Sequence, residues 1–194
     1  GILTHLTNQH MKKIFALPVS LIFTILAATS CSDSNTWDTY EEWRKDNNSY
    51  YEQQVSLKDL DGSDYYSLLS PSWYPTSGVL IHYFNDRSKT EGNLVPLVTS
   101  TVDVKYKGWL YNGEPFDSSY TNTANGDSIF RCRPTETIAG WQIALTNMAV
   151  GDSARVVIPW AQGYGTETSG SILPFSTLIF DIKLVNVYAY EINN

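Results

Sequence analysis

The sequence predicts an α+β domain, in which an antiparallel sheet wraps around one short helix, preceded by an N-terminal helical extension rich in aromatic residues. Apolar and polar residues alternate in several segments after Val79, as they do in half-buried strands. Residues 138–148 instead carry apolar residues at helical spacing. Residues 37–55 combine helical spacing with many rings, and this pattern predicts the extension.

The strand pattern is clearest in Thr101–Lys107, where alternation places three residues on the core face. Asn112-Gly113 follows as a signal for a tight turn. A first strand at 79–84 and a strand at 154–158 complete the sheet with a long terminal strand. The strand residues predicted to face the core are Val102, Val104, Tyr106, Leu178, Phe180, Ile182 and Leu184. The residues stacked along the short helix are Ile138, Trp141, Leu145 and Met148.

The extension reads WDTYEEWRKDNNSYYEQQV over residues 37–55, and neither Gly nor Pro interrupts it. Residues that recur at spacings of three and four predict one helix, with Trp37, Tyr40, Arg44, Asn47, Tyr51 and Gln54 along it. Two interpretations remain open. The rings pack against the main domain, or they form a surface for dimerisation or for binding client proteins.

Composition excludes several classes of protein. Hydrophobic residues make up 42% of the chain and charged residues 17%, which favours a folded core over disorder. The net charge of −7 disfavours nucleic acid as a partner. Cys31 and Cys132 are too few for a disulfide framework or a cysteine-rich zinc site, and His82 is the sole histidine after Cys31. We therefore expect chemistry without a metal, a cofactor or a general base.

The segment before Cys31 resembles a secretory signal. Lys12 and Lys13 follow Met11, and an apolar stretch of 15 residues follows them, short of the roughly 20 that a membrane-spanning helix needs. Small residues then precede Cys31, as in the lipobox of bacterial lipoproteins, and this resemblance implies that Cys31 carries the lipid. The alternatives are an ordinary cleaved signal and an uncleaved anchor.

These features predict three regions. Residues 1–31 form the signal peptide and lipobox, with Met11 as the true start, residues 32–77 form a tether and the helical extension, and residues 78–190 form the main domain. The expected location is the cell envelope of a Gram-negative bacterium, with the protein anchored by lipid in the outer membrane. The membrane is then one partner, and two or more acyl chains make such attachment stable.

Four segments, in this order along the chain, resemble the FKBP family of peptidyl-prolyl cis-trans isomerases. They are VKYKGWLYNGEPFDSS (104–119), TIAGWQIALTNMAVGD (137–152), RVVIPWAQGYG (155–165) and ILPFSTLIFDIKL (172–184). The resemblance covers about Gly78 to Val187. It implies an FKBP-like fold, an antiparallel sheet wrapped around one short helix, with an apolar pocket that binds proline-containing polypeptides and needs no cofactor.

The resemblance also implies a role for particular residues of this chain. Trp141 forms the floor of the pocket, Asp117 lies at its rim, and the backbone N–H of Ile138 faces a substrate carbonyl. Thr137 lies where the family has valine. The walls are formed by Tyr106, Phe116, Ile138, Tyr164, Ile172 and Phe180.

One departure from the family pattern concerns a pocket wall. Ser128 lies where the family has a second pocket phenylalanine, so we expect an open wall there and a gain in activity from Ser128→Phe. Two functions follow from these observations. The first is an isomerase that assists the folding of exported proteins through non-covalent catalysis in an aromatic pocket. The alternative is a catalytically weak FKBP-like chaperone or proline-peptide binding module.

Overall fold

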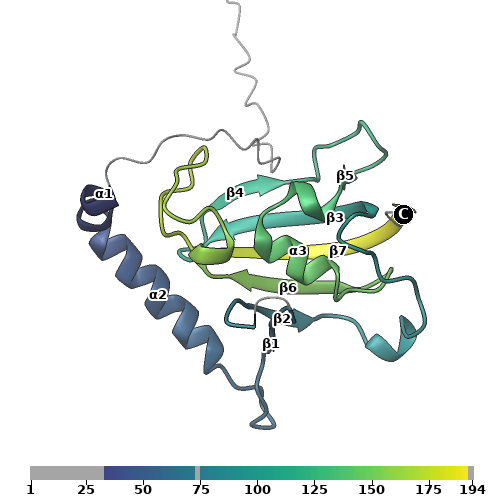
Figure 1. Ribbon diagram of the computed structural model, residues 1–194. Coiled ribbons are helices and arrows are strands. Elements are labelled where there is room, and N and C mark those ends of the chain that lie inside the picture. Colours follow the sequence, from purple (N-terminus) through teal and green to yellow (C-terminus); the bar gives the residue numbers. More distant parts are fainter. Residues whose placement is uncertain (1–32, 73–74, 192–194) are drawn as a thin grey trace, which may run out of the picture.

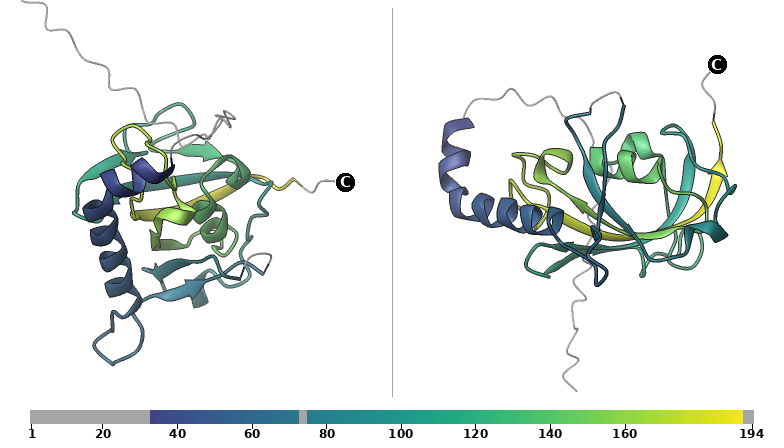
Figure 2. Two further views of the ribbon diagram at one scale, coloured as in Figure 1. Left: turned by 60° about the vertical axis from the view of Figure 1, so that its left-hand side comes forward. Right: turned by 90° about the horizontal axis from the view of Figure 1, so that it is seen from below.

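The structure is a computed structural model, which describes residues 33–72 and 75–191. Seven antiparallel strands form one sheet, which curves around the short helix α3 (Ala139–Leu145), as Figures 1 and 2 show. This arrangement confirms the predicted fold class. Cys31 and the predicted signal peptide lie outside the described residues, so their roles stay predictions.

The sheet follows the order β1-β2-β6-β7-β3-β4, and β5 pairs with β3 off this path. The long central pair of β3 and β7 sets the register, with Tyr106 opposite Ile182 and Gly108 opposite Phe180. The strands are β1 (Ser67–Leu69), β2 (Val79–Tyr83), β3 (Thr101–Leu110), β4 (Pro115–Ser118), β5 (Phe130–Cys132), β6 (Ser153–Ile158) and β7 (Leu178–Ala189). Three short 3-10 helices are η1 (Arg87–Lys89), η2 (Pro134–Glu136) and η3 (Trp160–Gln162).

The core lies between α3 and the face of the sheet toward it, and every residue predicted to face the core is buried there. α3 comes very close to β6. A side chain on Gly140 would meet Ile158 carbon atoms at 2.5 to 2.8 Å, so the helix can pack here because residue 140 has no Cβ. α3 ends at Leu145, earlier than the spacing predicted. Met148 lies beyond the end of the helix and is still fully buried.

The extension forms two helices, α1 (Asp33–Thr39) and α2 (Glu41–Val55), with a turn at Tyr40 between them. We call α1 and α2 together the arm. The arm runs along one side of the domain (Figures 1 and 2). The Trp43 Nε1–H donates to Ser176 Oγ at 3.1 Å, and the Trp160 Nε1–H donates to Asn48 Oδ1 at 3.0 Å. The rings of the arm therefore pack against the main domain, as the first interpretation expects.

β1 joins the region before residue 78 to the sheet, because its residues pair with β2 from Ser67 opposite Ile81 to Leu69 opposite Val79. Sequence alternation could not reveal a strand of three residues whose central side chain, Leu68, is exposed. The proposed boundary at residue 78 therefore falls just before β2, between two paired strands. Whether residues 78–190 fold alone stays a prediction.

Candidate functional site

A cluster of aromatic rings lies where β3, β4 and β7 face α3. The fully buried Trp141 meets Tyr106 edge-on with the ring centroids 5.0 Å apart, and it meets Phe180 at 5.3 Å. Phe116 extends the cluster, because its ring centroid lies 5.4 Å from that of Phe180. Edge-to-face contacts of this kind stabilise aromatic pairs beyond the area that they bury. The structure thus brings together four of the predicted pocket residues, which we call the ring cluster.

Gly108 explains how the rings fit over the sheet. A Cβ at this position of β3 would lie 2.7 Å from Phe116 Cζ and 2.9 Å from Phe180 Cε1. The strand therefore presents bare backbone under the two rings. A side chain here would push them apart, so the glycine belongs to the architecture of the site.

Phe130 adds a fifth ring to the ring cluster, and the sequence analysis did not assign it to the site. Its ring centroid lies 5.6 Å from that of Tyr106 and 6.3 Å from that of Trp141. Its signal was the strand pattern of Phe130 and Cys132, two residues apart before the helix.

Ser128 lies in the turn between β4 and β5 and is buried. Its backbone is left-handed, with φ at 63°, and its N–H donates to the Asn122 carbonyl at 2.8 Å. A bulky side chain is disfavoured in this backbone conformation. The structure therefore argues against the expected gain from Ser128→Phe, since the ring would add strain.

The backbone of Ile138 is fixed by the residues on either side of it. Thr137 is buried, its hydroxyl donates to the Pro134 carbonyl at 2.7 Å, and its carbonyl accepts from Gln142 Nε2 at 2.9 Å. Ile138 immediately precedes α3 with extended backbone, and its carbonyl accepts from the Trp141 N–H at 2.9 Å. Within the described part of the chain, the Ile138 N–H donates to no protein acceptor. Its predicted bond to a substrate carbonyl stays a prediction.

Asp117 and Tyr106 form the polar edge of the ring cluster. The Tyr106 hydroxyl donates to Asp117 Oδ2 at 2.7 Å, and the Ser118 N–H donates to Asp117 Oδ1 at 2.8 Å. Burial raises the pKa of Asp117, although these two hydrogen bonds act in the opposite direction. Burial and the nearby carboxylate raise the pKa of the Tyr106 hydroxyl, which therefore stays a donor at neutral pH.

The raised pKa of Asp117 predicts how stability changes with pH. A carboxyl group whose pKa is higher in the folded state contributes most below its unfolded pKa of about 4, and this contribution is lost as pH rises through the folded pKa. We therefore expect Asp117→Asn to gain stability relative to the wild type between pH 4 and pH 7.5. Urea unfolding at both pH values measures the difference. A difference that is independent of pH, or that shrinks as pH rises, would contradict the expected cause.

Tyr164 and Ile172 come from the segment between β6 and β7. Ile172 is buried in the core, and Ile172 and Ser169 exchange backbone hydrogen bonds at 2.9 and 3.0 Å. Burial raises the pKa of Tyr164, a hydrogen bond with Ser169 acts in the opposite direction, and the charge of Asp117 raises it further. Phe116, Asp117, Phe130 and Tyr164 are partly exposed, whereas Trp141 is not. This difference in exposure is compatible with Trp141 as a pocket floor and the partly exposed residues as its mouth, which stays a prediction.

Residues outside the ring cluster have structural roles. Burial raises the pKa of the Cys132 thiol to about 12, so Cys132 packs as a small apolar side chain. His82 stacks on Tyr65 with the ring centroids 3.9 Å apart. Over residues 33–72 and 75–191, His, Cys, Asp and Glu side chains nowhere gather in a group of three that would hold a metal ion. Among those same residues, no helix is long and apolar enough to cross a membrane.

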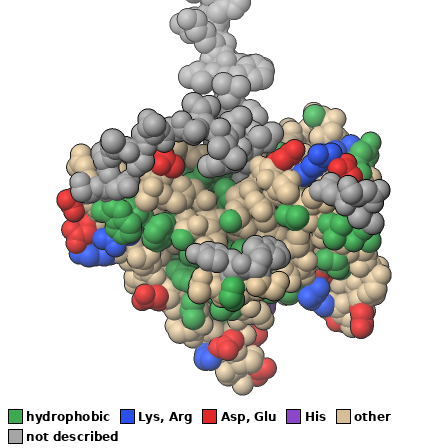
Figure 3. Space-filling view, in the orientation of Figure 1, with side chains coloured by type: hydrophobic (Ala, Val, Ile, Leu, Met, Phe, Trp, Pro, Cys, Tyr) green, Lys and Arg blue, Asp and Glu red, His purple; other side chains and the backbone are tan. Residues whose placement is uncertain are grey.

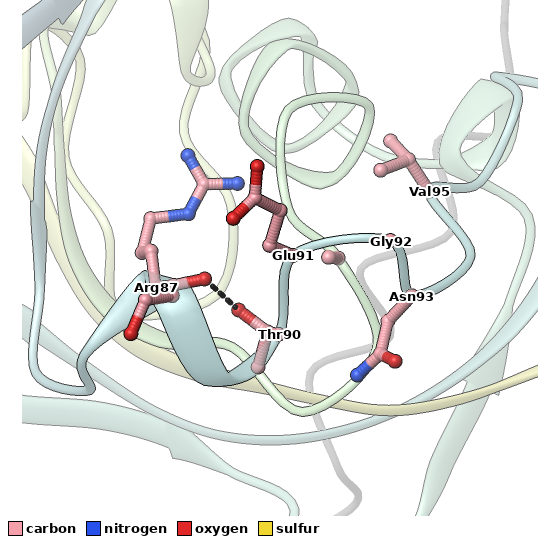
Figure 4. Close-up of a pocket in the computed structure, with 8 residues that line it drawn as sticks. Arg87, Thr90, Glu91, Gly92, Asn93 and Val95 are labelled. Atoms are coloured by element: carbon pink, nitrogen blue, oxygen red, sulfur yellow. Dashed lines mark hydrogen bonds between the residues drawn. The ribbon is translucent and has the colours of Figure 1, made fainter.

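A separate cavity of about 470 Å³ lies beside the connection between β2 and β3 (Figure 4). Arg87, Thr90, Glu91, Asn93 and Val95 line it together with smaller residues. Arg87 is engaged elsewhere: its guanidinium lies 3.3 Å from Asp152 Oδ2 and packs over the Tyr83 ring. No residue of the ring cluster lines this cavity, so it is distinct from the candidate site.

Comparison with known proteins shows which family this chain resembles. A family model described as FKBP-type peptidyl-prolyl cis-trans isomerase matches residues 95–185. FK506-binding protein 1 of Saccharomyces cerevisiae is 36% identical over 103 residues, which are 52% of this chain and 87% of that protein. FK506-binding protein 4 of Candida glabrata is 41% identical over 88 residues, 45% of this chain. The match covers 21% of that protein, and the chain likewise spans about a fifth of several such relatives.

Two solved bacterial structures share the fold. A peptidyl-prolyl cis-trans isomerase from Pseudomonas syringae is 26% identical and has a TM-score of 0.59, over 82% of this chain and 98% of that one. FkpA from Escherichia coli is also 26% identical and has a TM-score of 0.63, over 81% of this chain and 65% of that one. The antiparallel sheet, the short helix under the rings and these relationships agree: the chain belongs to the FKBP-type peptidyl-prolyl cis-trans isomerase family.

Proposed function

We propose that this protein catalyses the cis-trans isomerisation of X-Pro peptide bonds at the ring cluster. The observation that carries the proposal is the placement of the free Ile138 N–H at the start of the helix whose Trp141 forms the floor of the cluster. A prolyl ring enters between the partly exposed rings at the mouth and rests toward Trp141. The Ile138 N–H holds a carbonyl oxygen of the peptide.

Such a site can act without acids or bases. The barrier to rotation is roughly 18 to 20 kcal/mol because rotation breaks amide resonance, and no covalent bond has to be cleaved. The planar amide separates charge more than the twisted transition state does. Transfer from water to apolar rings therefore destabilises the planar amide relative to the twisted one, and this difference lowers the barrier.

Asp117 supports the site by orienting its neighbour. Its carboxylate accepts the hydrogen bond from the Tyr106 hydroxyl, and this bond fixes a ring that in turn contacts Trp141. At neutral pH the Tyr106 ring therefore presents its apolar edge to the floor of the cluster, and its polar end points to the rim. The carboxylate does not need to transfer a proton in this mechanism.

A protease-coupled assay on proline tetrapeptides that differ in the residue before proline tests the proposal. We expect measurable isomerisation with the highest kcat/KM for a bulky apolar residue, because the mouth is lined by apolar rings. Substrates with an acidic residue before proline should react more slowly, since Asp117 lies at the rim. A wild-type protein without any rate above background on the whole series would refute the proposal.

The alternative function is that of a proline-peptide binding module with weak catalysis. The observation that favours it is the complete burial of Trp141, together with a serine in place of a ring at Ser128. A site of this kind would bind the same tetrapeptides without accelerating their isomerisation. Titration of the peptides, followed by the fluorescence of the chain, separates the two functions when it is combined with the assay.

We further propose that the enzyme assists the folding of exported proteins while it is anchored at the cell envelope of a Gram-negative bacterium. The support is the sequence from Lys12 to Cys31, with its basic start, apolar stretch and small residues before the cysteine. The similar structures from Pseudomonas syringae and Escherichia coli agree with a bacterial context.

Lipidation predicts a simple change in partitioning. We expect the wild type, expressed in a Gram-negative host, to enter the detergent phase, and we expect Cys31→Ala to move it to the aqueous phase, because the lipid is attached through the cysteine thiol. Cys132→Ala serves as the matched control and should still enter the detergent phase. Membrane association of Cys31→Ala equal to that of the wild type would exclude the anchor.

A further inference from the structure

We propose that the arm is a positioning element of the candidate site: through Phe175, it fixes the segment 159–177 that carries Tyr164 and Ile172. This inference rests on the proposed function, since its consequence is for catalysis. Trp37 and Arg44, on the arm, lie outside the four family segments, whereas Trp160 and Phe175 lie within them but belong to neither the ring cluster nor the predicted site residues.

Phe175 has an unusual backbone for a bulky residue. Its φ is 62°, in the left-handed region that large side chains rarely adopt, and its side chain is fully buried. Such a conformation persists only where surrounding contacts hold it. The ring of Trp37 from the arm lies 4.7 Å away between centroids, and the ring of Trp160 lies 5.2 Å away on the opposite branch of the segment. Trp37 and Trp160 also meet edge-on at 5.9 Å.

Arg44, also in the arm, packs against this group of rings. Its guanidinium carbon lies 4.8 Å from the centre of the Trp37 ring and 5.8 Å from that of Phe175. We call Trp37, Arg44, Trp160 and Phe175 the clamp. The hydrophobic side chains beside charged groups at the left of Figure 3 lie over this end of the arm, and Trp37 itself is 38% exposed. A cation over aromatic faces adds electrostatic attraction to the packing.

The clamp is bonded directly to the backbone beside Tyr164. The Phe175 N–H donates to the Gly165 carbonyl at 2.8 Å, and the Gly165 N–H donates to the Trp160 carbonyl at 2.9 Å. Gly165 follows Tyr164 in the chain, and Phe175 comes three residues after Ile172. The two ends of the segment are thus tied together at the clamp, and the two predicted wall residues lie between the ties.

Polar contacts fix the end of the segment to the arm as well. Asn47 is fully buried. Its side-chain Oδ1 accepts from the Thr177 N–H at 2.7 Å, and its backbone carbonyl accepts from the Thr177 hydroxyl at 3.2 Å. Trp43 donates to Ser176, as described above. Thr177 immediately precedes β7, which carries Phe180. A buried polar residue such as Asn47, once its hydrogen bonds are formed, specifies one docking position of the arm.

Between these ties the segment is anchored by Ile172, which is buried in the core, and its backbone hydrogen bonds are local. The hydrogen bonds of Ser169 with Ile172 and of Glu167 with the Tyr164 carbonyl are local turns. Without the clamp, the left-handed Phe175 would relax and the wall residues would shift. Since small misplacements in a binding site reduce rates strongly, the arm would affect catalysis without touching the substrate.

Trp37→Ala tests this role in the full chain, because Trp37 is partly exposed and its loss should leave the sheet folded. We expect kcat/KM on proline tetrapeptides to fall by about tenfold, and the hydrogen exchange of the Gly165 and Phe175 amides to become faster by about tenfold or more. Trp37→Phe keeps a ring on Phe175 and should restore most of both values. Phe175→Asn tolerates the left-handed backbone, lacks the ring and should resemble Trp37→Ala.

Tyr50→Ala is the matched control. It removes another aromatic ring of the arm, one on α2 that contacts Tyr111 and not the clamp, so it should change neither the exchange of these amides nor kcat/KM. Unchanged amide exchange in Trp37→Ala, or an equal effect of Tyr50→Ala, would overturn the positioning role. A wild type without isomerase activity would instead refute the proposed function, and the exchange measurement would still decide whether the arm fixes the segment.

Discussion

Replacement of Trp141 by alanine is expected to remove nearly all isomerase activity and to destabilise the fold by about 3 to 5 kcal/mol. The side chain is fully buried, and its ring contacts Tyr106, Phe130 and Phe180. Alanine leaves a cavity that these rings cannot close without leaving their edge-to-face contacts. Urea unfolding measures the loss of stability, and the tetrapeptide assay on the folded variant measures the loss of rate, which should be about a hundredfold or more.

Trp141→Phe is the control that distinguishes the role of Trp141 in activity from its role in stability. In the described structure the buried Trp141 Nε1 has no hydrogen-bond partner, so phenylalanine loses volume but breaks no bond. We expect a smaller loss of stability, about 1 to 2 kcal/mol, and partial retention of activity. Full activity in Trp141→Ala at a temperature where it is folded would show that the ring cluster is core packing alone.

Asp152→Ala is expected to cost about 3 kcal/mol or more of stability, with little effect on the chemistry. The Asp152 side chain is fully buried and accepts from the Thr90 hydroxyl at 2.6 Å, from Asn85 Nδ2 at 3.0 Å and from the Ala149 N–H at 2.8 Å. The ion pair with Arg87 adds to these bonds. Alanine would leave several buried donors unsatisfied, and the connection between β2 and β3 would lose its tie to the turn before β6.

The pH dependence of this variant distinguishes the charge from the packing. Burial raises the pKa of Asp152, but the hydrogen bonds from Thr90, Asn85 and Ala149 together with Arg87 outweigh burial and lower it. This stabilisation is present above the unfolded pKa of about 4 and is lost as pH falls through the lower folded pKa. Asp152→Asn keeps the shape and should lose less stability than Asp152→Ala. If unfolding at pH 7 shows no loss for Asp152→Ala, the buried carboxylate does not hold this connection.

The sequence predicts best the elements whose residues alternate over long runs. β3 and β7 were predicted from Val102, Val104 and the terminal strand because each buries one face, and the structure places those residues in the core. The helical spacing of Trp141 and Leu145 likewise predicted α3. Turns are less regular. The arm bends at Tyr40 although neither Gly nor Pro lies there, and no periodic pattern marks a bend that tertiary packing imposes.

In the site, too, some features could be predicted from the sequence and others could not. The family motifs identified Tyr106, Phe116, Trp141 and Phe180, which the structure brings together. The left-handed backbone of Ser128 depends on its turn and leaves no trace in residue type, since serine has no special preference for it. Phe175 is a stronger case, because a phenylalanine predicts a left-handed residue least of all. Its ring contacts that of Trp37, which lies more than a hundred residues earlier in the arm, and no local pattern of residues indicates this contact.

The central claim is that the ring cluster accelerates rotation about X-Pro bonds. Exchange spectroscopy on a short X-Pro peptide, with the protein at a small fraction of the peptide concentration, tests it directly because cis and trans forms give separate signals. Uncatalysed interconversion takes tens to hundreds of seconds. We predict that the protein makes exchange faster in both directions, that the ratio of cis to trans is unchanged, and that Trp141→Ala abolishes the acceleration. Unchanged exchange with the wild type, while the peptide still binds, would contradict the claim.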